Sequence, residues 1–586
     1  MAAVLPDPFY YLENFRHVLA WVGTRHQDLL DARERGLIAR FHALPRAAQA
    51  LLVRMVMRKG DLFRHSRLDY PEIGDLAGPL ALLAQQELID AAPPLALDEL
   101  CGLLRKDELQ AVFGTALADL PRNARKDALL AHLQGRFPDA QPLARWSAAF
   151  GDTICRLLHT DVYDRLRLMF FGNLHQDWSE FVLTELGLLK YEAVELSTAS
   201  RAFAQRADVD AYLHLWHCRE RLEAGAATAD VLADLPAAPC ANAWLEERRG
   251  RLLFAIGQER ERERDWPGAF AAYRMSCAPE ARLRAIRVLE QDGKIEAAFR
   301  LASALQTGLH DTGGEGGGVL FPCEENDPKE SGTDCFFTAA PREEELQQLA
   351  RLLPRLRRKL GLAKAPAAPL IAPPRLDFTL APVDGWSVEW CVRAHLHADD
   401  APVFYVENAL INSLFGLLCW EAVFAPVPGA FFHAFHYGPA DLHHADFHAR
   451  RATEFAACLQ RLETGTHRDA ILATFREKHG TQSPFVFWDA LDEDLLTLAL
   501  DCIPPAHLHV LFTRLLADIR NNRSGFPDLI RFWPAEQRYL MLEVKGPGDR
   551  LQDNQIRWLD YCARHGIPVA VSHVTWAEAV TSCSAT

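Results

Sequence analysis

The residues with the clearest chemical potential lie between positions 520 and 558. Asp528 stands at the start of one apolar run, and Glu543 and Lys545 end a second run that is rich in strand formers. A turn-forming segment, 534–537, separates the runs, so they are predicted to pair as a hairpin that brings Asp528 close to the other two residues. Glu543 and Lys545 are two positions apart on one strand and therefore point to the same face.

Two carboxylates and an ammonium group at one end of a sheet fit the metal-assisted hydrolysis of a phosphodiester. Carboxylate oxygens suit hard divalent cations such as Mg²⁺ and Mn²⁺, which act as Lewis acids and as sources of hydroxide. The alternative is that Asp528 is a turn residue and that Glu543 and Lys545 form a solvated pair at a strand end. The apolar strand residues Leu540 and Leu542, and the Gly-Pro-Gly segment that follows Lys545, favour the first interpretation.

The segments GFPDL and LEVKGPGDRLQDNQ, followed by Trp558, resemble the PD-(D/E)xK nuclease superfamily. These segments are similar to the VRR-NUC branch of that superfamily and, more narrowly, to the Fanconi-associated nucleases of DNA crosslink repair. The resemblance implies a multidomain protein with mostly α N-terminal and middle regions, which hold a SAP-like module and degenerate TPR-like repeats. A C-terminal α/β PD-(D/E)xK nuclease domain would follow them.

The resemblance also implies roles for individual residues of the motif. Asp528, Glu543 and the carbonyl of Val544 would bind one or two Mg²⁺ or Mn²⁺ ions. Lys545 would orient the attacking water, and Gln555, on a helix predicted over 551–563, would support the site. Two neighbouring strands and this helix are thus expected to form the catalytic centre.

A third carboxylate is expected from a helix predicted to open at Val406. In the family, a helix of this kind precedes a Leu-rich run and a tryptophan, and the match of LFGLLCW places Glu407 at the metal-binding position. A glutamate in a first helical turn is also favoured by the helix dipole alone. Glu421 is the competing candidate, although it follows the tryptophan.

The overall composition excludes a protein that coats nucleic acid through bulk charge. The chain has 586 residues and a formal net charge of −15, so DNA binding would depend on local basic patches. Its 13 cysteines form no CxxC pair, which indicates reduced thiols and a cytoplasmic protein, nucleoid-associated if the source is bacterial. No signal peptide is expected, and polar residues and prolines interrupt the most apolar stretch, 409–432, so no membrane partner is predicted.

The basic patches fall in three regions. The alternative explanation for the first is a solvated helix face, and for the SAP-like module an ordinary helical hairpin. The family resemblance favours DNA contact through an N-terminal helical domain, 1–92, and a SAP-like module, 93–140. Further arginines near the motif would hold phosphates beside the scissile bond. The predicted contacts are Arg54, Arg58, Lys59, Arg122, Arg125, Lys126, Arg520, Arg523 and Arg550.

The remaining boundaries follow from composition. Residues 141–370 are predicted to be a TPR-like helical region that contains a flexible Gly- and Glu-rich loop, 311–343, and residues 371–586 the nuclease domain. The predicted function is metal-dependent endonuclease and 5′–3′ exonuclease action near 5′ flaps and branched DNA in interstrand crosslink repair. A junction resolvase of the same superfamily and a non-catalytic DNA-binding scaffold are the alternatives, and the sequence identifies no protein partner.

Overall fold

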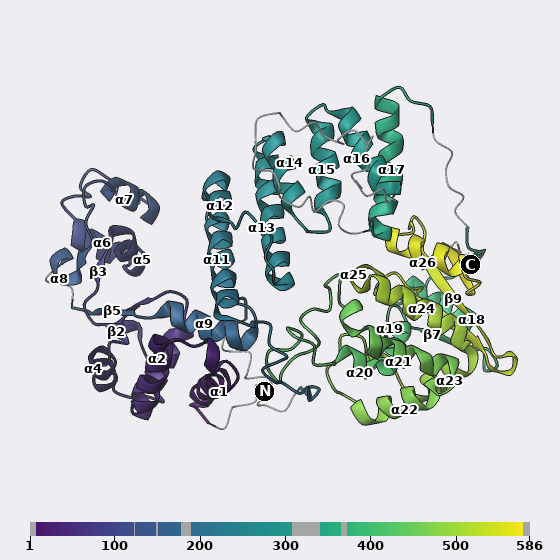
Figure 1. The fold of residues 1–586 in the computed structure, drawn as a ribbon, viewed down its shortest axis with the longest axis horizontal. Helices are drawn as coiled ribbons and strands as arrows, with labels where there is room; N and C mark the ends of the chain where they lie inside the picture. Colours follow the sequence, from purple (N-terminus) through teal and green to yellow (C-terminus); the bar gives the residue numbers. More distant parts are fainter. Residues whose placement is uncertain are drawn as a thin grey trace, which may run out of the picture. The chain divides into compact units, whose positions relative to one another are not determined.

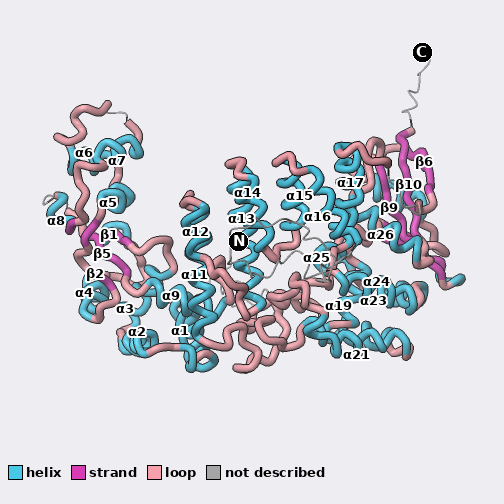
Figure 2. Tube along the Cα trace, turned by 45° about the horizontal axis from the view of Figure 1, so that its top comes forward, coloured by secondary structure: helices cyan, strands magenta, loops and turns pink. Residues whose placement is uncertain are grey.

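The computed structural model describes residues 7–121, 124–147, 151–176, 189–307, 340–364 and 372–577. Two compact units make up the chain, Met1–Lys190 and Tyr191–Thr586 (Figure 1). Mostly helical N-terminal and middle regions precede an α/β region near the C-terminus, which confirms the predicted fold class (Figure 2). The predicted loop 311–343 lies outside the described residues except for its end, 340–343.

The first unit packs helices around a small antiparallel sheet. Its strand order is β1-β5-β2, and the middle strand, β5, pairs with both neighbours. The strands are β1 Leu62–Arg64, β2 Ile89–Asp90 and β5 Ile154–Leu157, and the helices are α1 Tyr10–Arg25, α2 Ala32–Ala43, α3 Arg46–Val56, α4 Ala77–Gln85 and α9 Thr160–Phe171. Residues 151–176, which we assigned to the TPR-like region, therefore belong to the N-terminal unit.

The SAP-like module is inserted between β2 and β5. It contains β3 Pro94–Leu95, β4 Gln141–Pro142, α5 Leu97–Leu103, α6 Lys106–Phe113, α7 Lys126–Leu133 and α8 Leu143–Trp146. Arg64 of β1 joins the module to the sheet, since it pairs with Glu108 at 2.7 Å and with Asp152 at 2.8 Å. Arg64 and Asp152 are buried and hydrogen-bonded to one another, as buried charges must be to remain stable.

A row of helices begins the second unit, and each packs against the next along the chain. They are α11 Arg206–Glu223, α12 Thr228–Asp234, α13 Ala243–Arg262, α14 Trp266–Met275, α15 Ala281–Gln291, α16 Ile295–Thr307 and α17 Glu343–Lys359. Small and aromatic residues interlock here: a Cβ on Gly257 of α13 would lie 2.6 Å from the ring of Tyr273. The last helix, α17, contacts the nuclease region through Arg351 and Asp553, 2.6 Å apart (Figure 1).

A mixed five-stranded sheet organises the C-terminal region, in the order β6-β10-β9-β8-β7. Its central strands, β9 and β10, are parallel, whereas β8 pairs antiparallel with both β9 and β7. The strands are β6 Arg375–Leu380, β7 Val403–Tyr405, β8 Leu529–Trp533, β9 Arg538–Lys545 and β10 Val569–Trp576. The predicted hairpin is thus present as β8 and β9, while the edge strands β6 and β7 were not predicted.

Helices cover the sheet and supply the largest apolar core of this unit. The apolar faces of α19, α23 and α24 meet around Phe415 and Phe512, whose rings lie 5.5 Å apart. The helices of this region are α18 Val388–Leu396, α19 Leu410–Leu418, α20 Trp420–Val423, α21 Ala452–Glu463, α22 His467–Lys478, α23 Glu493–Cys502, α24 Pro505–Ala517, α25 Ile519–Asn522 and α26 Asp553–Arg564.

Among the described residues, no single helix combines the length and apolar character needed to cross a membrane. The bent pair α23 and α24 meets that test only when its two helices are taken together.

Candidate active site

The hairpin brings Asp528 against the end of β9. Leu529 pairs with Leu542, so Asp528, one residue earlier, faces Glu543 across the ladder. The backbone N–H of Val544 donates to Asp528 Oδ2 at 2.8 Å, which fixes the carboxylate. The predicted convergence of the motif follows directly from this register.

Glu543 and Lys545 lie on the same face of β9, and both are buried, with Glu543 0% and Lys545 7% exposed. Lys545 Nζ is 2.8 Å from Glu543 Oε1, and Gln555 Nε2 donates to the same oxygen at 2.6 Å. The structure therefore places Gln555 of α26 beside the carboxylate that it was predicted to support.

Close packing of α26 on the motif loop sets the position of Gln555. Gly525 has φ +95°, and a Cβ there would lie 2.8 Å from the backbone carbonyl carbon of Asn554. The rings of Phe526 and Trp558 are 4.0 Å apart. Only glycine tolerates both this dihedral angle and this approach, so the turn before Asp528 brings the helix onto the site.

The two carboxyls are held in an environment that disfavours their charge. The pKa of Asp528 is raised to about 6, chiefly by burial. The negative charges of Glu389 and Glu407 also raise this pKa, whereas the hydrogen bond from the Val544 N–H lowers it. Burial, together with the charge of Asp528, raises the pKa of Glu543 to about 8, although Lys545 lowers it. Buried carboxyls with perturbed pKa values mark functional sites, and a bound cation would relieve their repulsion.

The donor set at this centre fits a hard cation. Glu543 Oε2 is buried and has no hydrogen-bond partner in the part of the chain that the structure describes, which leaves an oxygen available beside Asp528. Within those same residues, no three His, Cys, Asp or Glu side chains are drawn together tightly enough to form a closed metal site. Asp528 and Glu543 thus supply a pair of carboxylates, with further ligands required from nearby groups.

Glu407 lies close to this pair but not on a helix, which corrects the predicted position in a first helical turn. Its exposed carboxylate accepts hydrogen bonds from Tyr405 Oη and Asn408 Nδ2. Asn408 has φ +52°, and its Oδ1 accepts from the N–H groups of Gly525 and Phe526 at 2.9 and 3.1 Å. The corner that carries Glu407 is thereby bound to the loop that precedes Asp528.

The competing candidate, Glu421, has a different environment. It lies on α20, is exposed, and pairs with Arg461 at 3.2 Å. Glu389, in the first turn of α18, was missed from the sequence, although its charge acts on both Asp528 and Tyr405. No local pattern distinguishes Glu389 from any other acidic residue in a first helical turn.

The three arginines predicted to hold phosphates near the scissile bond are not brought together. Arg523 donates to the carbonyl of Pro484 and lies over the ring of Phe485, and burial lowers its pKa. Arg520 pairs with Glu280 at 3.1 Å, whereas Arg550 is exposed. The Arg520 side chain is also 39% exposed, so Arg520 and Arg550 both have the accessibility that a phosphate contact requires.

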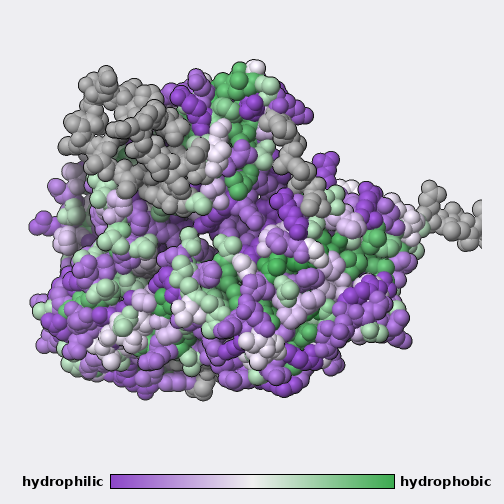
Figure 3. Space-filling model, turned by 45° about the vertical axis from the view of Figure 1, so that its right-hand side comes forward, coloured by the Kyte–Doolittle hydropathy of each residue, from purple (hydrophilic) through white to green (hydrophobic). Residues whose placement is uncertain are grey.

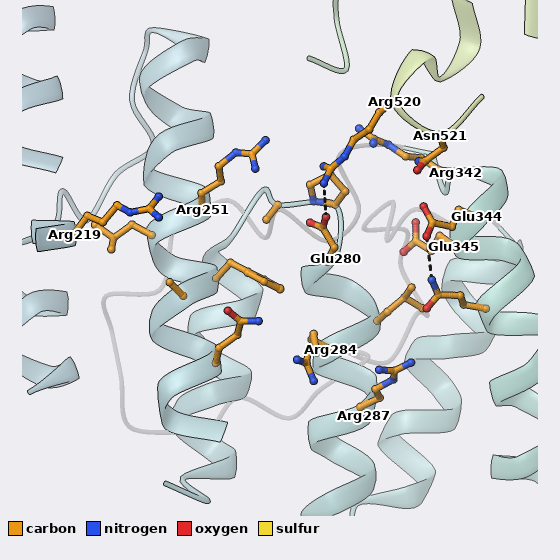
Figure 4. Close-up of a pocket in the computed structure, with 18 of the residues that line it drawn as sticks. Arg219, Arg251, Glu280, Arg284, Arg287, Arg342, Glu344, Glu345, Arg520 and Asn521 are labelled. Carbon is orange, nitrogen blue, oxygen red and sulfur yellow. Dashed lines mark hydrogen bonds and ion pairs between the residues drawn. The ribbon is translucent and has the colours of Figure 1, made fainter. Parts of the chain in front are cut away.

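Arg520 borders a polar pocket of about 710 Å³ between the helical row and the nuclease region (Figure 4). Arg284 and Arg287 reach into it from α15, and Arg342, Glu344 and Glu345 line its other side. Most of the arginines that line it already have acidic partners. Arg251 pairs with Glu247, Arg284 with Glu261, and Arg219 with Glu223. The pocket is therefore largely charge-compensated.

In the first unit, the residues of the predicted basic face differ in accessibility. Arg54 pairs with Glu72 at 2.6 Å and lies over the ring of Tyr11, while Arg58 and Lys59 are exposed. In the SAP-like module, Arg125 is exposed at the start of α7, and Lys126 Nζ donates to the carbonyl of Gly102 at 3.3 Å. Arg122 lies outside the described residues.

Known protein families match three segments of the chain. The FAN1 HTH domain matches residues 9–90, the Fanconi anemia-associated nuclease SAP domain residues 94–146, and the VRR-NUC domain residues 462–576. The Fanconi-associated nuclease 1 homolog of Pseudomonas aeruginosa is 54% identical over 574 residues, which cover 98% of this chain and 97% of that protein. The chain belongs to the Fanconi-associated nuclease 1 family.

More distant family members match across kingdoms. The homolog of Oryza sativa subsp. japonica is 24% identical over 97% of this chain and 63% of its own length, and the human protein is 24% identical over 96% and 62%. A crystal structure described as paFAN1 bound to 5′ flap DNA with a gap superposes with a TM-score of 0.81 at 53% identity. It covers 98% of this chain and 100% of that one. Sequence and fold thus agree over nearly the whole chain.

Proposed function

We propose that this member of the Fanconi-associated nuclease 1 family is a metal-dependent, structure-specific DNA nuclease. Its substrates would be 5′ flaps and related branched DNA, cut by endonuclease and 5′–3′ exonuclease action in interstrand crosslink repair. The observation that carries the proposal is the buried group Asp528, Glu543 and Lys545 at the end of β9. The paFAN1 structures described with 5′ flap DNA support the choice of substrate.

Asp528, Glu543, the Val544 carbonyl and Glu407 would hold one or two Mg²⁺ or Mn²⁺ ions. When bound, such an ion supplies Lewis acidity toward the phosphate oxygens and acidifies water. The unpartnered Oε2 of Glu543 and the raised pKa of both carboxyls support this assignment, because a cation would compensate charge that the protein alone disfavours.

Lys545 would orient the attacking water through its ammonium group. Its buried Nζ already neutralises Glu543 Oε1, which leaves two further N–H bonds free to direct a water or a phosphate oxygen. Gln555 would keep Glu543 in place by donating to that same oxygen. Both side chains act on the geometry of the carboxylate pair.

Substrate DNA would be held by exposed basic residues outside the catalytic centre. Arg58, Lys59, Arg125 and Arg550 have the accessibility that phosphate contacts need, and Lys126 adds charge next to Arg125. Arg520 is exposed and would add a further phosphate contact, although it also pairs with Glu280. Arg54 and Arg523 would shape the surrounding structure through the internal contacts described above. We propose domain boundaries at 92, 140 and 370, with residues 151–176 returning to the N-terminal unit through β5 and α9. We place the site of action in the cytoplasm or nucleoid.

The proposal is tested by incubating end-labelled 5′-flap, 3′-flap, four-way-junction and single-stranded DNA with Mn²⁺ and with EDTA. Metal-dependent cutting concentrated on the 5′ flap is expected. Asp528→Ala should abolish cleavage and retain DNA binding, and Glu407→Gln should lower cleavage, whereas the matched exposed control Glu421→Gln should not. Symmetric cutting of four-way junctions, or binding without cleavage in every metal, would refute the assignment.

A further inference from the structure

Exposed aromatic side chains gather beside the active site. Of the eight large hydrophobic side chains exposed in the described ranges, four belong to one stretch of the nuclease region: Val383, Trp386, Trp390 and Tyr405. The face drawn in Figure 3 is mostly hydrophilic and is interrupted by separate hydrophobic areas. Large aromatic side chains left in water contribute little burial energy to the fold, and a contiguous exposed group of them is typical of a binding site.

The centre of this cluster is a stacked pair of rings. Trp390 of α18 and Tyr405 of β7 have centroids 6.2 Å apart and planes inclined by 25°. The rings nevertheless remain 44% and 39% exposed, so each keeps surface available to a ligand. The guanidinium of Arg393 lies 4.8 Å from the Trp390 centroid and adds a positive charge beside the rings.

A turn directly before α18 carries a third exposed aromatic residue. The N–H of Trp386 donates to the carbonyl of Val383 at 3.1 Å, and Gly385 between them has φ +76°. Trp386 is 50% exposed at the end of this turn. We name Trp386, Trp390 and Tyr405 the aromatic platform.

The aromatic platform is continuous with the catalytic centre. Tyr405 Oη donates to Glu407, and Tyr405 pairs with Leu529, the residue after Asp528. On the other side of the pair, Glu389 precedes Trp390 directly, and its charge acts on Asp528. The same chain segments therefore carry both the carboxylates and the aromatic rings.

The first turn of α18 also lies against the end of β9. Val388 Cγ1 is 3.7 Å from the position that a Cβ on Gly546 would take, one residue beyond Lys545. A strand whose phosphate reached Asp528 and Glu543 would thus pass beside this turn. Because Tyr405 pairs with Leu529, the residue after Asp528, a base stacked on the rings would lie near the scissile phosphate.

We propose that the aromatic platform stacks an unpaired base of the DNA strand that enters the active site. A base inside a duplex has both faces covered by its neighbours, whereas an unpaired base offers a free face to an aromatic ring. Base–aromatic stacking is strong and tolerant of sequence, and Arg393 can meet the adjoining phosphate. The inference rests on the proposed nuclease function and gives it a means of sensing single-stranded DNA at the cut.

The test is a double-mutant cycle between a ring and a base. Binding of a fluorescent 5′-flap DNA to the full chain is measured by anisotropy in EDTA, with the unpaired nucleotides normal or abasic. Trp390→Ala should weaken binding of the normal flap about tenfold, within the range of about 5- to 150-fold that stacking of one base supports. On abasic DNA the same substitution should have little effect, and Trp390→Phe should restore most of the loss.

Leu362→Ala is the matched control. Leu362 has the same exposed fraction as Trp390, 44%, but lies outside the nuclease region, just after the end of α17. It should leave both affinities unchanged. Trp386→Ala provides a second variant that breaks no ring pair of the core, should Trp390→Ala unfold. A 2-aminopurine at the unpaired position should be quenched on binding the unsubstituted protein and less so on binding Trp390→Ala.

Equal losses on normal and abasic flaps, or on flush duplex, would overturn the platform while leaving the nuclease function intact. A change in oligomeric state caused by Trp390→Ala would likewise overturn it in favour of a second copy of the chain as the occupant. Failure of the unsubstituted protein to prefer flaps over duplex and to cleave them with Mn²⁺ would instead count against the proposed function.

Discussion

Replacing Asp528 by asparagine should stabilise the metal-free protein above pH 7, although it removes a central residue of the site. The carboxyl is 8% exposed, and burial raises its pKa from 3.8 to about 6. The folded protein therefore binds this proton more tightly than the unfolded chain does. The stability that the protonated group confers is complete below about pH 4 and is lost as the pH rises through about 6.

The size of the effect follows from the pKa. Each pKa unit corresponds to about 1.36 kcal/mol, so ionising Asp528 costs up to about 3 kcal/mol, and sharing of the proton with Glu543 reduces this to about 1–3 kcal/mol. Asparagine does not titrate. Its Oδ1 can still accept from the Val544 N–H, and its Nδ2 can donate to the unpartnered Oε2 of Glu543. For a domain of this size we expect the melting temperature to rise by about 2–10 °C.

The assay is scanning calorimetry of the full chain in EDTA at pH 5 and pH 8.5. Asp528→Asn should be the more stable protein at pH 8.5, and its advantage should be about half as large at pH 5, which lies between the unfolded and folded pKa values of Asp528. Mn²⁺ should reverse that order, because ligand at 100 times its Kd stabilises only the protein that binds it, by about 2.7 kcal/mol. A variant that is less stable in EDTA at pH 8.5, or equally shifted at both pH values, would refute the reasoning.

Three further variants test other contacts. Gln555→Ala should weaken Mn²⁺ binding about 10- to 100-fold in a calorimetric titration with unchanged circular dichroism, because it releases Glu543 Oε1. Arg58→Ala combined with Lys59→Ala should lower the slope of log Kobs against log salt concentration for duplex binding by about 2, because two phosphate contacts are lost. A loss of nuclease activity with an unchanged slope would exclude these phosphate contacts. Gly525→Ala should lower the melting temperature more than Gly566→Ala, since both glycines have positive φ but only the first meets backbone atoms, of α26.

The hairpin of the active site was predictable because it is local. Its strands are separated by a short turn, and their side-chain alternation fixes which residues face each other. Asp528, Glu543 and Lys545 could therefore be placed together without knowledge of the rest of the fold. The same applies to the helix that carries Gln555, which is marked by its own apolar pattern.

The small sheet of the first unit was not predictable in this way. Its strands have two to four residues, too few to show a period, and β5 reaches its partners only after the SAP-like module has intervened. Glu407 was placed on a helix because the apolar run after it is helical. The left-handed Asn408 starts that helix later, and this depends on hydrogen bonds to Gly525 and Phe526, more than 100 positions away.

The sequence by itself determined the chemistry of the site: which carboxylates, which lysine, and which family they resemble. Tertiary structure decided how that chemistry is tuned. Glu389 on α18 reaches the pair from a distant segment, and the surrounding core removes Asp528 and Glu543 from water. Desolvation is a property of everything packed around a group, so the raised pKa values, and the aromatic platform beside them, emerge only when those segments are folded together.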